Sequence, residues 1–309
     1  MKEQFDIPIL YTVFNRLDSI KQTFPEIRKI RPKQLFIGAD GPRNPEEKAK
    51  TDSVRKYILE NVDWDCEVKT LFFKKNLGVN VATFKAIDWF FKNVEKGIIL
   101  EDDDLPSLSF FTFCKEMLTK YEKTPKVMSI SGFTPIKISP RNKESYYFSK
   151  NFGVWGWATW RDRWQKADLL SSDFDKIEKN NDLKKIIKNP IERVIFKRIF
   201  KHSLVGNVSD WAFSFTFVHY KNNAICIKPK RNLIKNLGFI EESTNTTNNF
   251  IDRRFLCIEA SKLDNPIVHP KKVEINKYLC NKEMRTDILR KSLKRILNKI
   301  GIIKYKYSY

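Results

Sequence analysis

The chain has 309 residues and a mass of 36.6 kDa, enough for one large α/β domain or two smaller ones. Hydrophobic residues make up 41% and aromatic residues 13%, which excludes a disordered chain. Lys and Arg number 58 against 37 Asp and Glu, and the net charge of +21 favours polyanionic partners: nucleic acid, anionic lipid or phosphorylated substrates.

The cysteines and the apolar runs indicate where the protein works. The five cysteines are Cys66, Cys114, Cys226, Cys257 and Cys280. An odd number without C-x-x-C spacing is a poor disulfide framework and predicts a reducing cytoplasm. No cleavage signal follows the apolar run at 7–14 and no run reaches 18 apolar residues, so we expect neither secretion nor a membrane span.

Short apolar runs alternate with helical periodicity in the first 121 residues. We expect strands at 7–14, 34–39, 67–73 and 98–100, and helices at 19–30, 46–61, 81–91 and 108–121. This alternation predicts a mostly parallel sheet whose strands end at one common edge.

The later chain is less regular. We expect strands at 127–130 and 224–228, helices at 191–200 and 212–220, a polar helical excursion from 166, and a loop over the site at 232–249. The segment 146–164 is dominated by aromatic residues.

A buried strand runs directly into four consecutive acids, Glu101-Asp102-Asp103-Asp104, and Pro106 then ends its pairing. Open α/β sheets bind ligands at such carboxyl ends of strands. Four like charges repel each other unless a cation or a cationic partner lies among them, and oxygen ligands suit Mg²⁺ or Mn²⁺ carried on a diphosphate. A solvated acidic turn is the alternative, but the apolar strand leading into the run favours a ligand site.

At these residues the chain resembles the GT-A fold nucleotide-sugar glycosyltransferases, in particular N-acetylglucosaminyltransferase I and the bacterial haemolysin-associated sugar-transferase-like proteins. The other matching motifs are Phe14-Asn15-Arg16, Asp40-Gly41-Pro42-Arg43, Asn76-Leu77-Gly78, Ala86-Ile87-Asp88-Trp89-Phe90, Trp155-Gly156-Trp157-Ala158-Thr159-Trp160 and Asn236-Leu237-Gly238-Phe239. The resemblance implies an α/β GT-A fold, with a mostly parallel Rossmann-like central sheet flanked by helices.

The resemblance also implies roles for individual residues. Asp103 would ligate Mn²⁺ or Mg²⁺ on the donor diphosphate, with Glu101 and Asp102 at the donor and Asp104 an extra acid without a role. The residues implied in the base-binding wall are Thr12, Phe14, Asn15, Arg16, Asp40, Asn76 and Gly78. In this wall a carboxylate can accept the imide N–H of uracil, although Asn76-Leu77-Gly78 is also an ordinary turn sequence.

An inverting transfer also needs a base and an acceptor site. Asp210, before Trp211 at a predicted helix start, resembles the family's base, and an N-cap is its structural alternative. Trp155, Trp157 and Trp160 have flat faces of the kind that bind sugars, and we expect one or two of these indoles to face the site while the others pack in the core. The candidate acceptor residues are Trp155, Gly156 and Trp157.

The histidines depart from the family pattern. Relatives often carry Thr-His-Thr after the Gly-Phe element, where this chain has Asn245, and His269 is the nearest candidate replacement. We expect His202 and His219 to be structural.

The end of the chain is basic and amphipathic, with apolar residues at helical spacing over 288–300. Residues 281–309 would bind an anionic membrane surface, or else dock on the domain. The division expected is a glycosyltransferase domain at 1–270 and a tail at 271–309. Within that domain, 1–105 would bind the nucleotide, and 106–270, with its helical excursion at 166–205, would bind the acceptor.

Together these features predict a metal-dependent, inverting glycosyltransferase that uses a nucleoside diphosphate sugar to extend lipopolysaccharide or capsule. A UDP-sugar is the first candidate donor. It would be cytoplasmic, peripheral on the inner membrane face, and without a specific nucleic-acid partner. A metal-dependent phosphodiesterase or nuclease and a non-catalytic nucleotide-sugar or membrane-binding pseudoenzyme are the alternatives.

Overall fold

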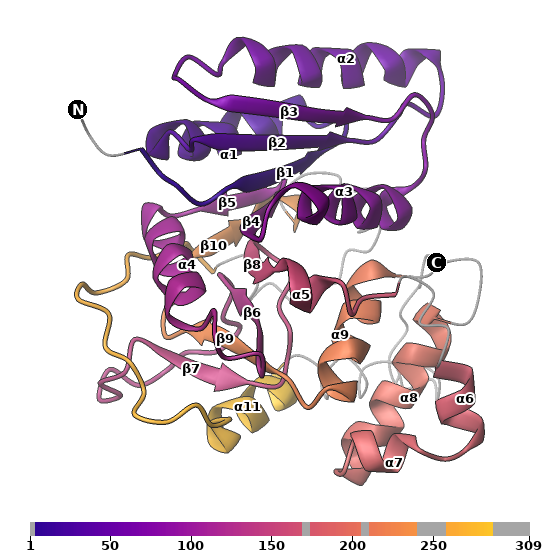
Figure 1. The fold of residues 1–309 in the computed structure, drawn as a ribbon, viewed down its shortest axis with the longest axis vertical. Helices are drawn as coiled ribbons and strands as arrows, with labels where there is room; N and C mark the ends of the chain where they lie inside the picture. The colour runs from indigo at the N-terminus through magenta and orange to yellow at the C-terminus, as the bar shows by residue number, and fades with distance from the viewer. Residues whose placement is uncertain (1–3, 169–173, 205–209, 240–257, 287–309) are drawn as a thin grey trace, which may run out of the picture.

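The computed structural model describes residues 4–168, 174–204, 210–239 and 258–286. Its centre is an eight-stranded sheet in the order β3-β2-β1-β4-β8-β6-β9-β7 (Figure 1). The strands of this sheet are β1 (Ile9–Val13), β2 (Gln34–Ala39), β3 (Glu67–Phe72), β4 (Lys96–Glu101), β6 (Val127–Ser131), β7 (Tyr146–Ser149), β8 (Trp157–Trp160) and β9 (Ile225–Pro229). The short strands β5 (Asp104–Pro106) and β10 (Ile234–Asn236) form a separate antiparallel pair.

Helices cover both faces of the sheet. They are α1 (Leu17–Ile30), α2 (Pro45–Glu60), α3 (Val79–Asn93), α4 (Leu108–Lys120), α5 (Arg161–Trp164), α6 (Phe174–Lys179), α7 (Leu183–Ile186), α8 (Pro190–Leu204), α9 (Trp211–Lys221) and α11 (Lys277–Met284), with a 3₁₀ turn η1 at Leu237–Phe239. Within the described ranges, none of them has the length and apolar character needed to cross a bilayer.

The first 121 residues fold as their pattern predicts, because each expected strand and helix is present with ends within two residues of the prediction. Side chains alternate across the fully buried β1, as in any strand. Ile9 and Tyr11 belong to the core cluster that contains Phe24 of α1 and Phe111 of α4, whereas Leu10 belongs to the cluster with Phe90 of α3. The strands therefore lie between two helical layers.

The second half completes the sheet with strands that the sequence did not reveal. β8 runs antiparallel between β4 and β6, pairing Lys96 with Trp160 and Ile130 with Ala158. Every residue of β7 and of β8 is buried, so neither strand shows the polar alternation that marks a half-exposed strand. Four of the seven strand pairs are parallel, which confirms an α/β class with a mostly parallel sheet.

Two other expected regions differ in detail. Residues 232–239, expected as a loop, contain β10, which pairs Asn236 with Asp104 of β5, while 240–249 lie outside the described residues. The segment from 166 contains α6 and α7, which share an apolar cluster with α8 (Figure 1).

A buried ion pair joins α11, the last helix among the described residues, to the sheet. Glu283 pairs with Lys228 of β9 at 3.0 Å, and both side chains are buried. Glu283 also accepts hydrogen bonds from Tyr147, Ser149 and Asn151. Most of the predicted amphipathic tail, residues 287–309, lies outside the described residues.

Candidate functional site

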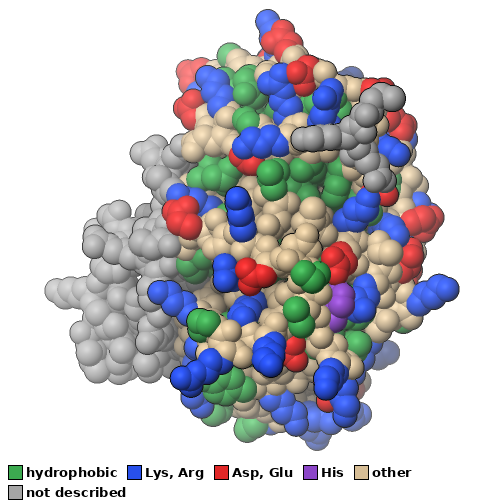
Figure 2. Space-filling model, turned by 90° about the vertical axis from the view of Figure 1, so that its left-hand side faces the viewer, with side chains coloured by type: hydrophobic (Ala, Val, Ile, Leu, Met, Phe, Trp, Pro, Cys, Tyr) green, Lys and Arg blue, Asp and Glu red, His purple; other side chains and the backbone are tan. Residues whose placement is uncertain are grey.

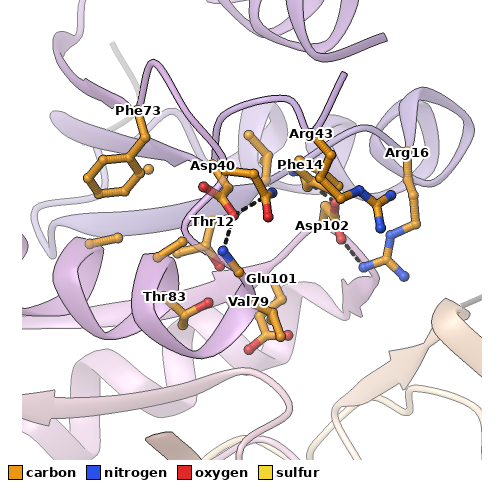
Figure 3. Close-up of a pocket in the computed structure, with 16 residues that line it drawn as sticks. Thr12, Phe14, Arg16, Asp40, Arg43, Phe73, Val79, Thr83, Glu101 and Asp102 are labelled. Atoms are coloured by element: carbon orange, nitrogen blue, oxygen red, sulfur yellow. Dashed lines mark hydrogen bonds and ion pairs between the residues drawn. The ribbon is translucent and has the colours of Figure 1, made fainter. Parts of the chain in front are cut away.

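The candidate site lies where β1 and β4 end side by side. After β1 the chain continues to β2, which pairs with β1 on one side, whereas β4 pairs with β1 on the other side. The connections that follow β1 and β4 therefore run in opposite directions across the sheet. A crevice at such a switch point is the usual ligand site of an open α/β sheet. A cavity of about 210 Å³ opens there (Figure 3). It is smaller than sites that enclose a whole drug-sized ligand, so it suits one end of a larger molecule.

The predicted donor-site residues gather at this cavity. Those that line it are Thr12, Phe14, Arg16, Asp40, Asn76, Gly78, Glu101 and Asp102. Asn15 lines a neighbouring surface hollow with Arg16, and its amide donates to Glu47 at 2.8 Å. Their roles toward a donor stay predictions, but four separate segments do meet at one place.

Asp40 holds the loop that closes one wall of the cavity. One of its oxygens accepts the backbone N–H groups of Gly41 and Leu77, at 2.7 and 2.9 Å. The other accepts the Asn76 amide and the Gly78 N–H, at 2.9 and 3.1 Å. A carboxylate has about four acceptor positions, and these are used. Asp40 therefore shapes the wall of the cavity, and its role toward a base stays a prediction.

Arg16 lies across the first two aspartates of the acidic run. It forms an ion pair with Asp102 and donates to Asp103 at 3.2 Å, and Figure 3 shows its guanidinium turned toward Asp102. Burial would lower the pKa of Arg16, but Asp102 and then Asp103 raise it above its usual value. Arg16 is therefore a fixed positive charge between two carboxylates.

Burial makes the acids themselves hard to ionise. Burial raises the pKa of Asp102 to about 6, although Arg16 and the N–H of Phe14 oppose the shift. Burial and then Asp103 raise the pKa of Glu101 and of Asp104 well above the ordinary range. Additional positive charge at this edge would favour the ionised forms of all three acids.

Asp104, which had no predicted role, supports the site from behind. One of its oxygens accepts the backbone N–H groups of Glu101 at 3.1 Å and Gly156 at 2.8 Å. Asp104 thus links the end of β4 to the loop that carries Trp155 and Gly156.

Asp103 has two neighbours from far along the chain. The amide of Asn236 donates to it at 3.4 Å, and a Cβ placed on Gly238 would overlap its Oδ2. Both residues belong to a quoted family motif, yet no role was predicted for them. The pairing of β10 with β5 and the hydrogen bond from the Leu237 N–H to the Asp103 carbonyl bring them to the acids.

The acidic run supplies carboxylate oxygens, the ligand type that a divalent metal such as Mg²⁺ prefers. Within the described residues, no three or more His, Cys, Asp or Glu side chains form a cage for a metal ion. A magnesium-type ion needs only one or two protein carboxylates when a diphosphate supplies other oxygens. Asp103, whose side chain is more exposed than that of Asp102, fits this smaller requirement.

Asp210 lies outside the lining of the cavity and is the N-cap of α9. Its side chain accepts the N–H groups of Ala212 at 2.9 Å and Phe213 at 3.4 Å. Burial raises the pKa of Asp210, partly offset by these two bonds. Asp210 therefore does act as an N-cap, and its role as the catalytic base stays a prediction.

The tryptophans of the 155–160 motif differ in burial: some lie in the core and one lies closer to the surface. Trp157 has no exposed surface and stacks on Trp211 at 5.8 Å, so the expectation that it contacts an acceptor fails. Trp155 is half-buried against Phe133, and Gly156 adopts a positive φ of 52°. Of the three predicted acceptor residues, Trp155 and Gly156 still qualify.

The histidines are engaged elsewhere. His219 is buried and contacts the Ser129 hydroxyl and the Phe215 carbonyl, each at 2.8 Å, as expected of a structural histidine. His269 contacts Glu116 and Tyr146, so it does not replace the expected site histidine. Asn245 lies outside the described residues, and so do the side-chain surroundings of His202.

Comparisons with known proteins found partial likenesses in structure only. No protein-family model matches the sequence, and no curated protein does. The mannosyltransferase PcManGT from Pyrobaculum calidifontis, in complex with GDP-Man and Mn²⁺, is similar over 52% of this chain and 46% of its own, at 13% identity and a TM-score of 0.37. S. aureus TarS 1-349 is similar over 74% of this chain and 59% of its own, at 12% identity and 0.42.

A third match is the galactosyltransferase LgtC in complex with donor and acceptor sugar analogs, over 57% of this chain and 66% of its own, at 10% identity and 0.33. Two of the three are named as sugar transferases. The chain spans less than two thirds of the length of the first two, and the site is assigned from its own geometry.

Proposed function

We propose that the chain is a glycosyltransferase that moves a sugar from a nucleoside diphosphate sugar to a glycan or glycolipid acceptor. The first candidate donor is a UDP-sugar, and the acceptor would belong to a surface polysaccharide such as lipopolysaccharide or capsule. One observation carries the proposal. A small cavity at the sheet's switch point adjoins an Asp102–Asp103 pair bridged by Arg16, which places a nucleoside-sized hollow beside groups suited to a diphosphate.

Phe14, Arg43 and the 76–78 loop would bind the nucleoside. The Arg43 guanidinium lies 5.5 Å from the centre of the Phe14 ring, and Glu47 fixes Arg43 from behind. Glu47 also accepts the Asn15 amide, so the two walls of the cavity are tied together. An aromatic ring backed by a held guanidinium presents a flat surface on which a base can stack.

Arg16 and Asp103 would receive the diphosphate. Arg16 would orient it, since a guanidinium matches phosphate oxygens in pairs. Asp103 would hold Mn²⁺ or Mg²⁺, which neutralises charge on the departing nucleoside diphosphate when it is bound. Asp104 keeps the Gly156 backbone beside this point.

Asp210 is the proposed base for an inverting transfer. The raised pKa that burial gives its carboxyl favours proton uptake from an attacking hydroxyl. The N-cap bonds leave it anchored to the first turn of α9, which would fix its direction. Trp155 and Gly156 would form part of the acceptor site.

We extend the proposal to the organisation of the chain. Residues 1–105 would bind the nucleotide and 106–270 the acceptor, while 271–309 would hold the protein on the anionic inner face of the membrane. This arrangement would present lipid-linked acceptors to a cytoplasmic enzyme.

Thermal shift and turnover test the proposal together. A UDP-sugar with Mn²⁺ at about 100 times its Kd should add about 2.7 kcal/mol to the stability of the full chain. Asp103→Asn should abolish Mn²⁺-dependent donor turnover without unfolding the protein, whereas Asp88→Asn, at an exposed ion pair on α3, should not. Binding of UDP without turnover would indicate a non-catalytic protein. Cleavage of oligonucleotides with Mg²⁺ would indicate a phosphodiesterase.

A further inference from the structure

The outer face of α8 is unusual because its exposed side chains are either basic or aliphatic. Ile191, Val194, Arg198 and Lys201 follow one another at spacings of three and four, so they form a single stripe on the helix. Ile191 is 63% exposed and Val194 69%, and Arg198 and Lys201 are also exposed. The opposite face, with Phe196 and Phe200, packs in the core cluster shared with α6 and α7.

The charge around this stripe is mainly positive, although Glu178 of α6 pairs with Lys197 at 3.2 Å and with Lys201 at 3.5 Å. Residues 183–201 contain seven Lys and Arg and one acid, Glu192. Glu192 is buried and paired with Lys150, so it contributes little negative charge to the surface. The exposed Lys184 and Lys188 precede the stripe at the turn from α7 into α8. By contrast, the face in Figure 2 shows Lys and Arg spread over its whole height with acids among them.

We propose that this α8 surface, made of Lys184, Lys188, Ile191, Val194, Arg198 and Lys201, binds an anionic lipid bilayer. Its lysines and arginines would lie against lipid phosphates, and Ile191 and Val194 would enter the boundary between headgroups and acyl chains. The proposal is independent of the catalytic assignment and of the tail, because it concerns different residues.

Charge and exposure select a bilayer over other partners. Nucleic acid would use the same basic residues but gains nothing from two exposed aliphatic side chains at the centre of the stripe. A second copy would bring two positive surfaces together, which like-charge repulsion opposes. Aliphatic residues surrounded by basic ones are typical of helices that lie in a membrane interface.

Vesicle co-sedimentation of the full chain tests the proposal, with phosphatidylcholine vesicles compared to vesicles that also contain phosphatidylglycerol. We expect binding only to the anionic vesicles, weakened by salt. Lys184→Gln with Lys188→Gln and Arg198→Gln should lower the partition coefficient roughly a hundredfold. Ile191→Ser with Val194→Ser should lower it by about tenfold even at high salt, since it removes buried apolar area.

A matched control is Leu59→Ser with Lys56→Gln on α2, at the far end of the molecule from α8 (Figure 1). It should leave the partition unchanged. Partition of both α8 variants within twofold of the parent would overturn the proposal. So would α8 variants that lose oligonucleotide binding or self-association while keeping vesicle binding. Donor turnover in solution should be the same in all variants, which separates this test from that of the proposed function.

Discussion

The Arg16 guanidinium spans Asp102 and Asp103, so one cation just after β1 pairs with two acids just after β4. Two buried carboxylates side by side would otherwise repel each other. The pairing also holds a phosphate-binding group in the middle of the proposed donor site before any donor arrives.

We predict that Arg16→Gln weakens donor binding roughly ten- to a hundredfold, because charge-assisted hydrogen bonds contribute about 1.5–3 kcal/mol each. Arg16→Lys should recover only part of the affinity, since an ammonium group does not span two carboxylates. Calorimetric titration with UDP measures the effect. Arg28→Gln, which breaks an exposed pair with Asp63, is the control and should bind UDP normally. Equal affinity of Arg16→Gln and the parent would remove Arg16 from the site.

Gly238 gives a second prediction. A methyl group at this position would overlap Oδ2 of Asp103, so Gly238→Ala must displace the carboxylate. A displacement of about 1 Å at a reacting site costs roughly a hundredfold in rate, and we expect that loss in donor turnover with little change in Tm. Lys235→Ala on the neighbouring strand β10, whose ion-pair partner is Glu259, should keep its activity. Full activity of Gly238→Ala would show that the position of Asp103 is not critical.

His219 predicts a pH dependence of stability. Burial lowers the pKa of His219 to about 4, below the ordinary value of 6.5. Between these two pH values the unfolded chain binds a proton that the folded chain does not, so the free energy of unfolding falls as the pH falls. The full loss is about 3 kcal/mol near pH 4. Urea unfolding at several pH values measures it.

A His219→Gln variant supplies the comparison for this pH experiment. It loses stability at neutral pH because the contacts with Ser129 and Phe215 change, but it has no imidazole to titrate. Its unfolding free energy should therefore fall less steeply between pH 6.5 and 4 than that of the parent. Parallel curves for the two proteins would contradict the assignment.

The sequence revealed the parts of this molecule that local pattern determines. The four parallel strands and their helices follow from apolar periodicity, and the polar residues after β1, β2 and β4 converge because parallel strands end at one edge. β7 and β8 escaped notice because each has only four residues and lies in a segment so rich in aromatic residues that neither strand stands out as a separate apolar run.

The two site residues that the sequence did not predict, Asn236 and Gly238, lie near Asp103 because of contacts between segments distant in the chain. Asn236 and Gly238 reach Asp103 through contacts between segments more than 130 residues apart, the β5–β10 pair among them, and nothing local in either segment encodes that contact. The hydrogen bonds of Asp40 could not be predicted for a similar reason, since its four donors come from its neighbour and from a loop 36 to 38 residues later.

The antiparallel insertion of β8 also has a consequence during synthesis of the protein. β1 to β4 can pair as soon as residue 101 has left the ribosome, but the outer edge of β4 has no neighbour until residues 157–160 emerge. At a usual synthesis rate of about 5–20 residues per second, that edge is unpaired for several seconds. An unpaired edge of Ile98 and Ile99 invites contact with other nascent chains, so slow translation between these points should favour aggregation over folding.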